Sequence, residues 1–583
     1  MDSTSDAHYG PMQGDPIEAA SSNQAAECRD LAGEVHENET EMHRLPSLVV
    51  SNDPEGPRSN LKICAIMLAL SLGLFLSALD QTIVATATPT ISADLHSGTG
   101  YVWIGGAYLL ANAASSNIWA NLSDIWGRKP ILLAAVALFF LSSIVCAAAI
   151  DMPMLIAGRG LQGIAGGGLL QLTTIVISDL FSVRNRSLFL GLIEFIWAIA
   201  GAIGPLVGGA LTQSVTWRWI FWINLPISGV AFLLMFFFLD IHNPKTSMWD
   251  GIKAVDWYGS LSILGLTIML LLGLDFGGDT FPWNSPKVIC LIVFGCVMAL
   301  VFVFCEKRLA KYPLMPLGIF KEMSNVACLL VGFTHGFAFL GAEYYLPLYF
   351  QSAKAASPFH SGLLILPFVL SEAGLSLAAG IIIHRTGRYL EIIWIGMAFV
   401  VCGMGLFINY DATSSLGKII GYQIAAGLGC GLLFFPPLLA LQNNVPQSAN
   451  ASATATFCFV RNVAMAMSVV LGGVVFQNSM DMQQSTLIGA GLSASTTEEL
   501  TGAEAAANVV VIPSIEDAGQ RQAVKDAYAL SLRNLWILYA CLAAVGFVAS
   551  LFIGRQQLRK EHVEMKTGLK EKSSMSEDGR LDV

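Results

Sequence analysis

The chain has 583 residues, and 54% of them are hydrophobic while only 13% are charged. Soluble domains average about 25% charged residues, so much of the surface of this chain must face something other than water. The formal net charge is -10. Much of the acid lies in residues 1–60 and 478–533, so the charge gives no indication of nucleic-acid binding.

Residues 1–61 precede the first apolar run and are rich in acidic and small polar residues. Such a segment cannot bury enough apolar surface to fold alone, so we expect a disordered cytoplasmic tail. We expect no cleavable signal peptide, and the first apolar helix should act as an uncleaved insertion signal. The 11 cysteines show no paired spacing of a metal site or a disulfide framework, so we expect no metal and no cofactor.

Fourteen apolar runs follow, and each is long enough to cross a hydrocarbon core of ~30 Å as a helix. A backbone in lipid must satisfy its own hydrogen bonds, and the strands of a barrel would instead show short alternating segments. The sequence therefore predicts an all-α integral membrane protein. The predicted spans are 62–86, 101–120, 130–150, 154–178, 187–211, 218–239, 255–274, 287–305, 326–350, 359–383, 390–409, 416–440, 454–477 and 534–554.

Lysine and arginine in short loops indicate orientation, because these residues gather on the cytoplasmic side. With a cytoplasmic N-terminus, the short outside loops hold only Lys354, apart from three cations at span edges. The inside loops hold Arg128, Lys129, Arg184, Arg186, Lys245, Lys253, Lys307, Arg308, Lys311, Lys321, Arg385 and Arg388. We therefore expect a multi-pass cell-membrane protein with both termini in the cytoplasm. A vacuolar or vesicle membrane is the alternative.

Two sequence features bear on the surface of the protein in this topology. The N-glycosylation sequons at Asn38, Asn121, Asn185 and Asn450 all fall on the predicted cytoplasmic side, so we do not expect a glycoprotein. Residues 478–533 separate the last two spans and would form a long extracellular loop, because long loops cross membranes largely regardless of their charge.

One loop recurs in the two halves of the chain. Ala120, Asp124, Gly127 and Arg128 lie between the second and third spans, and Lys129 follows them. The same spacing returns about 260 residues later between the tenth and eleventh spans, at Gly380, His384, Gly387 and Arg388. Internal repeats of this kind are typical of transporters built from two related halves.

Two further strings stand out in the first half. Span one reads Leu79-Asp-Gln-Thr-Ile-Val-Ala-Thr-Ala-Thr-Pro-Thr-Ile91, and span five contains the glycine-rich string 201–209. In span five, glycine allows close helix approach and proline weakens the helix ladder. The residues concerned are Gly201, Gly204, Pro205, Gly208 and Gly209.

These strings resemble motifs of the major facilitator superfamily. The loop 120–129 is similar to G-x-L-x-D-x-x-G-R-K, with Ala120 in place of the first glycine, and 201–209 is similar to the antiporter signature G-x-x-G-P-x-x-G-G. Span one resembles L-D-x-T-I-V-x-x-A-x-P-x-I of the fourteen-span drug:proton antiporter branch. The strings 217–226 and 345–351 look like that branch in fungi, particularly its toxin and drug exporters. The resemblance implies that the loop 120–129 and its repeat form a cytoplasmic gate.

The resemblance also implies a domain organisation. Two six-helix bundles would occupy residues 62–239 and 306–554, and a linker with two extra spans would occupy residues 240–305. Residues 555–583 would form a second cytoplasmic tail. Alternating access would then rock one bundle against the other around a site at the midplane.

Ionisable residues inside predicted spans are costly and are functional candidates by default. They are Asp80, Arg159, Glu194, Glu343, Glu372 and Arg461. The three glutamates are candidate proton carriers, and Asp80 could carry a proton or orient another group. The two arginines stay charged, so we expect them to hold a carboxylate or transmit a conformational change. Each acid could instead belong to a structural ion pair.

We therefore predict proton-coupled efflux of small amphipathic organic molecules such as a secondary metabolite, toxin or drug. The alternatives are a proton-coupled importer of a nutrient or metal chelate and, less favoured, a non-transporting membrane sensor. No ATP-binding loop or cluster of catalytic residues indicates a primary pump or an enzyme. The expected partners are the substrate, protons and the bilayer, with no nucleic acid, and the protein should function as a monomer.

Overall fold

A computed structural model describes residues 49–50, 60–95, 100–241, 244, 246–277, 281–310, 314–501, 505–506, 508–558 and 565–566. Most of the two predicted tails therefore lies outside the described residues, as do Asn38, Lys245 and Lys311. The side chain of Pro205 is likewise not described, although its backbone lies within a helix.

Nearly all of the described chain is helical, as the apolar runs predict. The long helices are α2 (Asn60–Asp94), α3 (Gly100–Trp126), α4 (Arg128–Ala147), α5 (Met152–Leu180), α6 (Val183–Ser214), α8 (Asn224–Phe238), α10 (Trp257–Phe276), α11 (Pro286–Arg308), α12 (Met323–Ser352), α13 (Pro358–Thr386), α14 (Leu390–Phe407), α15 (Leu416–Leu433), α17 (Asn450–Asp481) and α20 (Ala518–Ser550). The short helices are α7 (Trp219–Trp222), α9 (Met248–Ala254), α16 (Pro436–Asn444), α18 (Gln484–Gly489) and α19 (Ala494–Glu499), with 3-10 helices at Leu317–Lys321, Gln447–Ala449 and Asn508–Ser514. Two short strands, β1 (Val49–Val50) and β2 (Met565–Lys566), pair antiparallel.

Thirteen helical segments of the described chain are long and apolar enough to cross a membrane. The remaining predicted span, 101–120, corresponds to α3, which has 27 residues and is therefore about 40 Å long at 1.5 Å per residue. Its polar residues, which include Asn112, Ser115 and Asn117, lower its hydropathy. Because α3 packs lengthwise against α5, it takes the place of the second span, and the prediction of an all-α membrane protein is confirmed.

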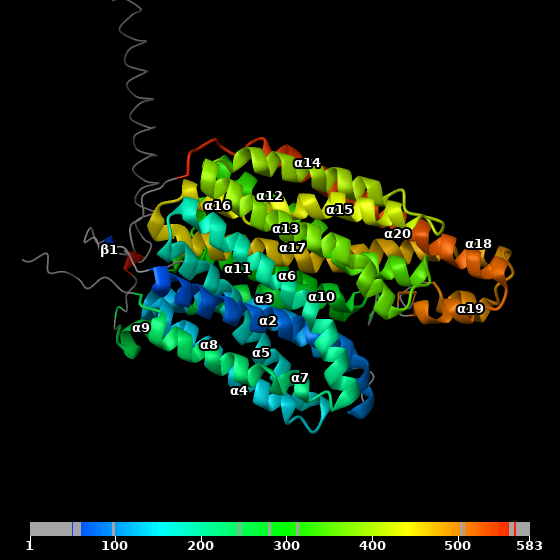
Figure 1. The fold of residues 1–583 in the computed structure, drawn as a ribbon, viewed down its shortest axis with the longest axis horizontal. Helices are drawn as coiled ribbons and strands as arrows, with labels where there is room; N and C mark the ends of the chain where they lie inside the picture. Colours follow the sequence, from blue (N-terminus) through cyan, green and yellow to red (C-terminus); the bar gives the residue numbers. More distant parts are fainter. Residues whose placement is uncertain are drawn as a thin grey trace, which may run out of the picture.

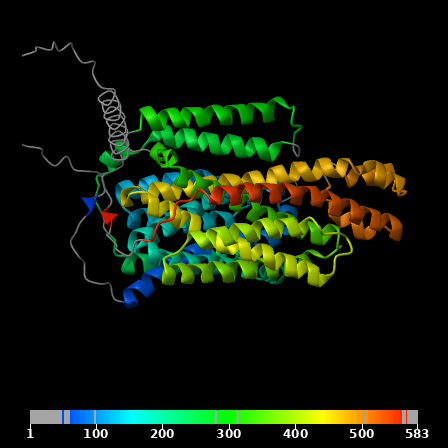
Figure 2. The same cartoon turned by 90° about the horizontal axis from the view of Figure 1, so that it is seen from above.

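The spanning helices form two bundles and a separate hairpin. Helices α2 to α8 form the N bundle, and α12 to α20 form the C bundle, which lies above it in Figure 1. The hairpin of α10 and α11 lies to one side of both bundles (Figure 2), and α10 contacts both α3 and α17. The extra pair of helices therefore touches each bundle at the junction between them.

The two ends of the molecule differ. The described chain enters α2 and leaves α20 at one end, which we call the tail end, while α18 and α19 lie at the opposite end, the loop end (Figure 1). The predicted loop 478–533 is largely structured, since α17 extends to Asp481 and α20 already begins at Ala518. Between them Leu487, Leu500 and Ile512 are buried, so this polar-looking segment has an apolar face that packs on the C bundle.

Candidate functional site

The N bundle contains a buried ion pair between two of the predicted intramembrane charges. Arg159 Nη1 lies 2.5 Å from Asp80 Oδ2, and the exposed fraction of the two side chains is only 1% and 0%. Arg159 comes from α5 and Asp80 from α2, so the pair joins two helices of the same bundle. The Arg159 guanidinium also lies over the Tyr108 ring, at 4.5 Å from the centroid. The structure thus places Asp80 beside a fixed cation.

Neutral polar groups complete this network around Asp80. Asn224 Nδ2 donates to Asp80 Oδ1 at 2.7 Å, and Gln162 Nε2 donates to the same oxygen at 3.2 Å. Arg159 Nη1 donates to Gln162 Oε1 at 2.9 Å, and its Nε donates to the backbone oxygen of Ile104 at 3.0 Å. Both oxygens of Asp80 therefore have donors, which is the condition for a stable buried carboxylate. Sequence reasoning missed Gln162 and Asn224, because uncharged amides carry no topological signal.

The three predicted carriers are brought together at the junction of the bundles. Gly191 of α6 and Gly380 of α13 meet where the two helices cross closely. Glu194 follows Gly191 by three residues, and Glu372 lies two turns before Gly380, so both face the junction on the side away from the tail end. Glu194 and Glu372 are each only 4% exposed. Glu343 of α12 is partly buried, and the charges of the three carboxyl groups act on one another.

Arg461 of α17 provides the cation of this region. Its Nη1 donates to the backbone oxygen of Phe434 at 3.3 Å, and its guanidinium lies 4.6 Å from the centroid of the Phe434 ring. The charge of Arg461 acts on Glu194, yet within the described residues neither Arg461 nor any of the three glutamates forms an ion pair. We call Glu194, Glu343, Glu372 and Arg461 the central cluster. Unlike the Asp80 carboxylate, these carboxylates have no fixed partner.

His335 lies beside the central cluster and was missed by the sequence reasoning. It shares one face of α12 with Phe339 and Glu343, since these residues are spaced four apart. Its Nε2 is 3.0 Å from the backbone oxygen of Cys430, so Nε2 carries the proton and Nδ1 is left as an acceptor. This Nδ1 is buried without a hydrogen-bond partner. A lone histidine in an apolar span gives little signal in sequence, because its neighbours come from other helices.

The predicted gate loop is much shorter than expected. Asp124 belongs to the last turn of α3 and Arg128 is the first residue of α4, so Gly127 alone joins the helices, with a φ of 96° that favours glycine. Arg128 is 1% exposed and contacts two carboxylates, Asp124 Oδ1 at 2.5 Å and Asp179 Oδ2 at 2.7 Å. Lys129 Nζ donates to the backbone oxygen of Phe236 at 2.7 Å. The loop thus ties α3, α4 and α5 together.

The repeated loop in the C bundle does not reproduce this geometry. His384 lies in the last turn of α13, and Gly387 caps that helix with a left-handed φ of 72°. Arg388, the counterpart of Arg128, is exposed and forms no ion pair within the described residues. In both halves the glycine allows a positive φ where a helix ends or begins, but the ion pairs differ. The identical spacing therefore does not produce two equivalent gate loops.

The two bundles are joined by hydrogen bonds at the tail end. Arg184 Nε donates to the backbone oxygen of His384 at 2.6 Å, and the same guanidinium donates to the backbone oxygen of Arg385. Ser187 Oγ donates to the backbone oxygen of Gly380 at 3.0 Å. Two further hydrogen bonds, from Arg186 to Gln442 and from Gln442 to Ser178, cross between the bundles at the same end. The molecule is therefore closed at its tail end.

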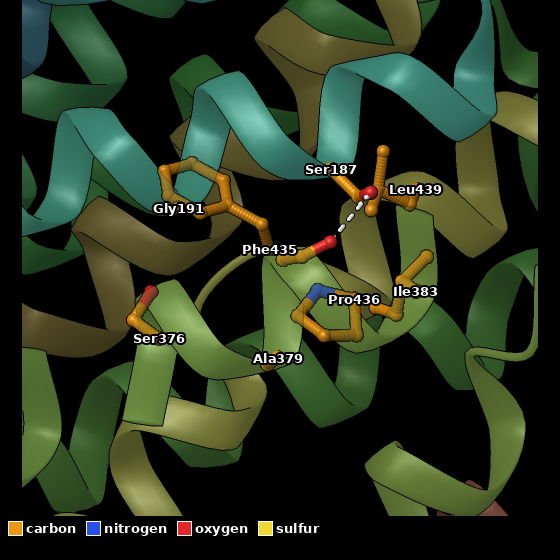
Figure 3. Close-up of a pocket in the computed structure, with 9 residues that line it drawn as sticks. Ser187, Gly191, Ser376, Ala379, Ile383, Phe435, Pro436 and Leu439 are labelled. Carbon is orange, nitrogen blue, oxygen red and sulfur yellow. Dashed lines mark hydrogen bonds between the residues drawn. The ribbon is translucent and has the colours of Figure 1, made fainter. Parts of the chain in front are cut away.

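A small cavity lies within this closure (Figure 3). It is lined by α6, α13 and the start of α16, and the dashed line in the figure marks the hydrogen bond that Ser187 donates to the backbone of α13. The cavity volume open to a water molecule is about 10 Å³, far below the roughly 300–1,000 Å³ of pockets for drug-sized ligands. We therefore interpret it as a packing gap at the closed interface.

The glycine-rich string of span five makes one close contact. A methyl group added at Gly204 would lie 2.1 Å from Thr82 Oγ1 of α2, whereas nothing lies within 4 Å of the same position on Gly201 or Gly209. Gly208 is buried, and α6 continues unbroken through the backbone of Pro205. The close approach expected for this string is thus seen at Gly204, against a residue of the span-one motif.

Comparisons with known proteins agree with this architecture. The family model described as "Major Facilitator Superfamily" matches residues 70–469. The chain is 49% identical over 507 residues to the efflux pump dotC of Dothistroma septosporum, with 87% of each chain covered. It is 44% identical to the MFS-type transporter ppz2 of Metarhizium majus, over 89% of this chain and 90% of that one. The human organic anion transporter MFSD10 superposes with a TM-score of 0.52 at 16% identity, covering 82% of this chain and 99% of that one.

Proposed function

The chain belongs to the Major Facilitator Superfamily, and from this membership we propose that it exports small amphipathic organic molecules in exchange for protons. Family membership makes it a transporter and not an enzyme. The direction is supported by the relative named an efflux pump at 49% identity. The close contact of Gly204 with Thr82 agrees with the resemblance of this string to the antiporter signature.

We further propose that the tail end faces the cytoplasm of the cell membrane. The cations that hold the closure together, Arg184 and Arg186, lie at this end, as the positive-inside rule requires. The closed tail end then corresponds to a state in which the pathway is shut toward the cytoplasm. Opening this closure while the loop end closes would present the central cluster to the cytoplasm. Both bundles belong to one chain, so we propose that the protein functions as a monomer.

The observation that carries the proposal is the gathering of three carboxyl groups without fixed partners between the bundles. Glu194 and Glu372 come from opposite bundles, so a change in the charge of either alters the attraction across the junction. Protonation neutralises a carboxylate, and deprotonation restores its attraction to Arg461. Proton uptake from outside can therefore favour one arrangement of the bundles, and release to the cytoplasm can favour the other.

The energy available from protons is sufficient for export. One proton moving down 100 mV releases about 2.3 kcal/mol, and a ratio of ten between the two sides of a membrane costs about 1.4 kcal/mol. One proton therefore supports a substrate ratio of more than tenfold from the voltage alone.

The proposal is tested with inside-out vesicles that contain the full chain, using the amphipathic dye rhodamine 6G as the probe. An imposed proton gradient, acidic inside, should drive dye uptake into the vesicles. Collapse of both the pH and the voltage gradient should abolish concentrative uptake. Uptake against a dye gradient that persists after this collapse would contradict proton coupling.

A further inference from the structure

Two buried acids lie outside the central cluster, at the tail end of the extra hairpin. Asp256 immediately precedes α10, and Glu306 lies in the last turn of α11. They are only 7% and 6% exposed. Neither was identified from the sequence, because Glu306 falls just beyond the predicted span 287–305 and Asp256 stands at the edge of the predicted span 255–274.

The two carboxyl groups face each other across a glycine. A methyl group added at Gly259 would lie 2.1 Å from Asp256 Oδ2 and 3.1 Å from Glu306 Oε1. The close approach of both acids thus requires glycine at this position.

Three of the four carboxylate oxygens already have backbone donors. Asp256 Oδ1 accepts from the Gly259 N–H at 2.8 Å. Glu306 Oε1 accepts from the Leu314 N–H at 3.1 Å, and Oε2 accepts from the Met315 N–H at 3.3 Å. Asp256 Oδ2 alone is buried without a hydrogen-bond partner, and it is the Asp256 oxygen that approaches the same position on Gly259 as Glu306 Oε1.

No cation balances the two acids in the part of the chain that the structure describes. The nearest basic residues along the chain, Lys253, Lys307 and Arg308, are exposed, and none of them forms an ion pair with either acid. The other titratable group close to both acids is the buried thiol of Cys305. Leu314 and Met315, whose N–H groups donate to Glu306, belong to an apolar cluster with Ile263, Phe302 and Phe459. The buried polar side chains nearby on α10 are the neutral hydroxyls of Ser260 and Ser262.

We propose that Asp256 and Glu306 together bind one proton, which Asp256 Oδ2 and Glu306 Oε1 share. Two like charges this close in a buried position cannot both ionise without a large cost, so one carboxyl group stays protonated. The proton comes from solvent at the tail end, and the O–H it forms gives the unpartnered oxygen its hydrogen bond. The shared proton then holds α10 to α11 and to the backbone at 314–315, in the segment that leads into α12 and the C bundle.

A proton fits this site better than a metal ion. Calcium takes six to eight oxygen ligands, whereas only one oxygen of this pair is free of a backbone donor. Within the described residues, no group of three or more histidine, cysteine or acidic side chains could hold a metal ion. Burial raises the pKa of Asp256, which lies just before the span Trp257–Leu274, more than the Gly259 hydrogen bond lowers it.

The site makes the attachment of the hairpin sensitive to pH. A carboxyl group whose pKa is raised by folding contributes stability below its pKa in the unfolded chain, and that stability is lost as the pH rises through the pKa in the folded chain. The hairpin should therefore be held firmly in acid and loosened at alkaline pH. Because this site lies outside the central cluster, its test is independent of transport.

The test uses Asp256→Asn in the full-length protein, purified in detergent, with thermal unfolding followed from pH 5 to pH 9. The introduced amide can donate to Glu306 at every pH, so the variant should match the wild type at pH 5 and exceed its melting temperature by a few degrees at pH 9. Glu306→Gln provides a second variant if Asp256→Asn does not fold. Its amide nitrogen cannot accept from a backbone N–H, so it should melt below the wild type at pH 5, and this difference in melting temperature should narrow or reverse at pH 9. Asp250→Asn, which removes an exposed acid from α9, should follow the wild-type curve.

A difference in melting temperature between wild type and Asp256→Asn that stays constant across the pH range would overturn the proposal. A lower melting temperature of the variant at pH 9 would overturn it too. A separate arm adds sodium, potassium or calcium chloride at pH 9. If one of these salts raised the wild type to the level of Asp256→Asn, the site would bind that cation and the shared proton would be rejected. No effect of the salts, together with the pH-dependent difference, supports the shared proton.

Discussion

Arg186 of the N bundle donates from Nη1 to Gln442 Oε1 of the C bundle at 3.0 Å, and Gln442 Nε2 in turn donates to Ser178 Oγ at 2.9 Å. Gln442 is 2% exposed and Arg186 is 1% exposed. A neutral amide from α16 is thus inserted between two helices of the opposite bundle. Such a contact can be broken and remade without separating buried opposite charges, which suits a tail-end closure that opens in every transport cycle.

The tail-end closure should be disrupted by a single added methyl group. A methyl group at Gly380 would lie 2.4 Å from the backbone oxygen of Ser187, whereas nothing lies within 4 Å of the same position on Gly374 of the same helix. We expect Gly380→Ala to force the bundles apart at the tail end and reduce dye efflux at least tenfold. Gly374→Ala is the matched control and should retain near-normal efflux. Equal rates for both variants would show that the closure is not part of the cycle.

The crossing of α2 and α6 gives a second glycine test. Gly204→Ala places a methyl group 2.1 Å from Thr82 Oγ1, and overpacking of this kind costs about 1–3 kcal/mol. We expect a lower melting temperature in detergent and reduced efflux. Gly201→Ala, three residues earlier on α6, meets no atom within 4 Å and should behave as the wild type. An unchanged melting temperature for Gly204→Ala would contradict the close crossing.

The buried ion pair of the N bundle should be far more important for stability than an exposed one. Asp80→Asn leaves Arg159 as an uncompensated buried charge, a loss of about 3–5 kcal/mol. Lys62→Ala breaks the exposed pair with Asp240, whose length is 2.7 Å, and should cost at most about 1 kcal/mol. Thermal unfolding of both variants provides the measurement, and comparable losses would show that Asp80 is not held as the structure indicates.

The two halves of the repeated loop should respond differently to the same change. Arg128→Ala leaves Asp124 and Asp179 facing each other without their shared cation, so expression and efflux should fall strongly. Arg388→Ala removes an exposed side chain and should leave both close to wild type. If expression and efflux fell equally in both variants, the two loops would be equivalent, as their spacing alone suggests.

Most of the fold could be predicted from the sequence because lipid imposes one strong rule, which is that long apolar runs become helices. The contacts that close the gate could not be predicted, since Arg184 and Ser187 donate to backbone oxygens, which every residue carries. The structured segment between α17 and α20 was also missed, because its buried residues are too widely spaced among polar ones to form an apolar run.

The candidate site was predicted in part. The rarity of charge in the spans marked the acids of the central cluster as candidates, and it left open whether Asp80 carries a proton or orients another group. Only the structure distinguishes the paired acid from the unpaired one, since pairing depends on Arg159, Gln162 and Asn224, which come from other positions along the chain.

The most direct test of proton-coupled efflux measures proton and dye movement together in liposomes with one orientation of the protein. Outward movement of rhodamine 6G should drive protons inward, read by a pH-sensitive dye, in the wild type and in the control Glu391→Gln, whose acid is paired with Arg555 at the surface at 2.8 Å. The triple variant of Glu194, Glu343 and Glu372 to glutamine should move dye only down its gradient, with no proton flux. Full coupling in the triple variant would contradict the account.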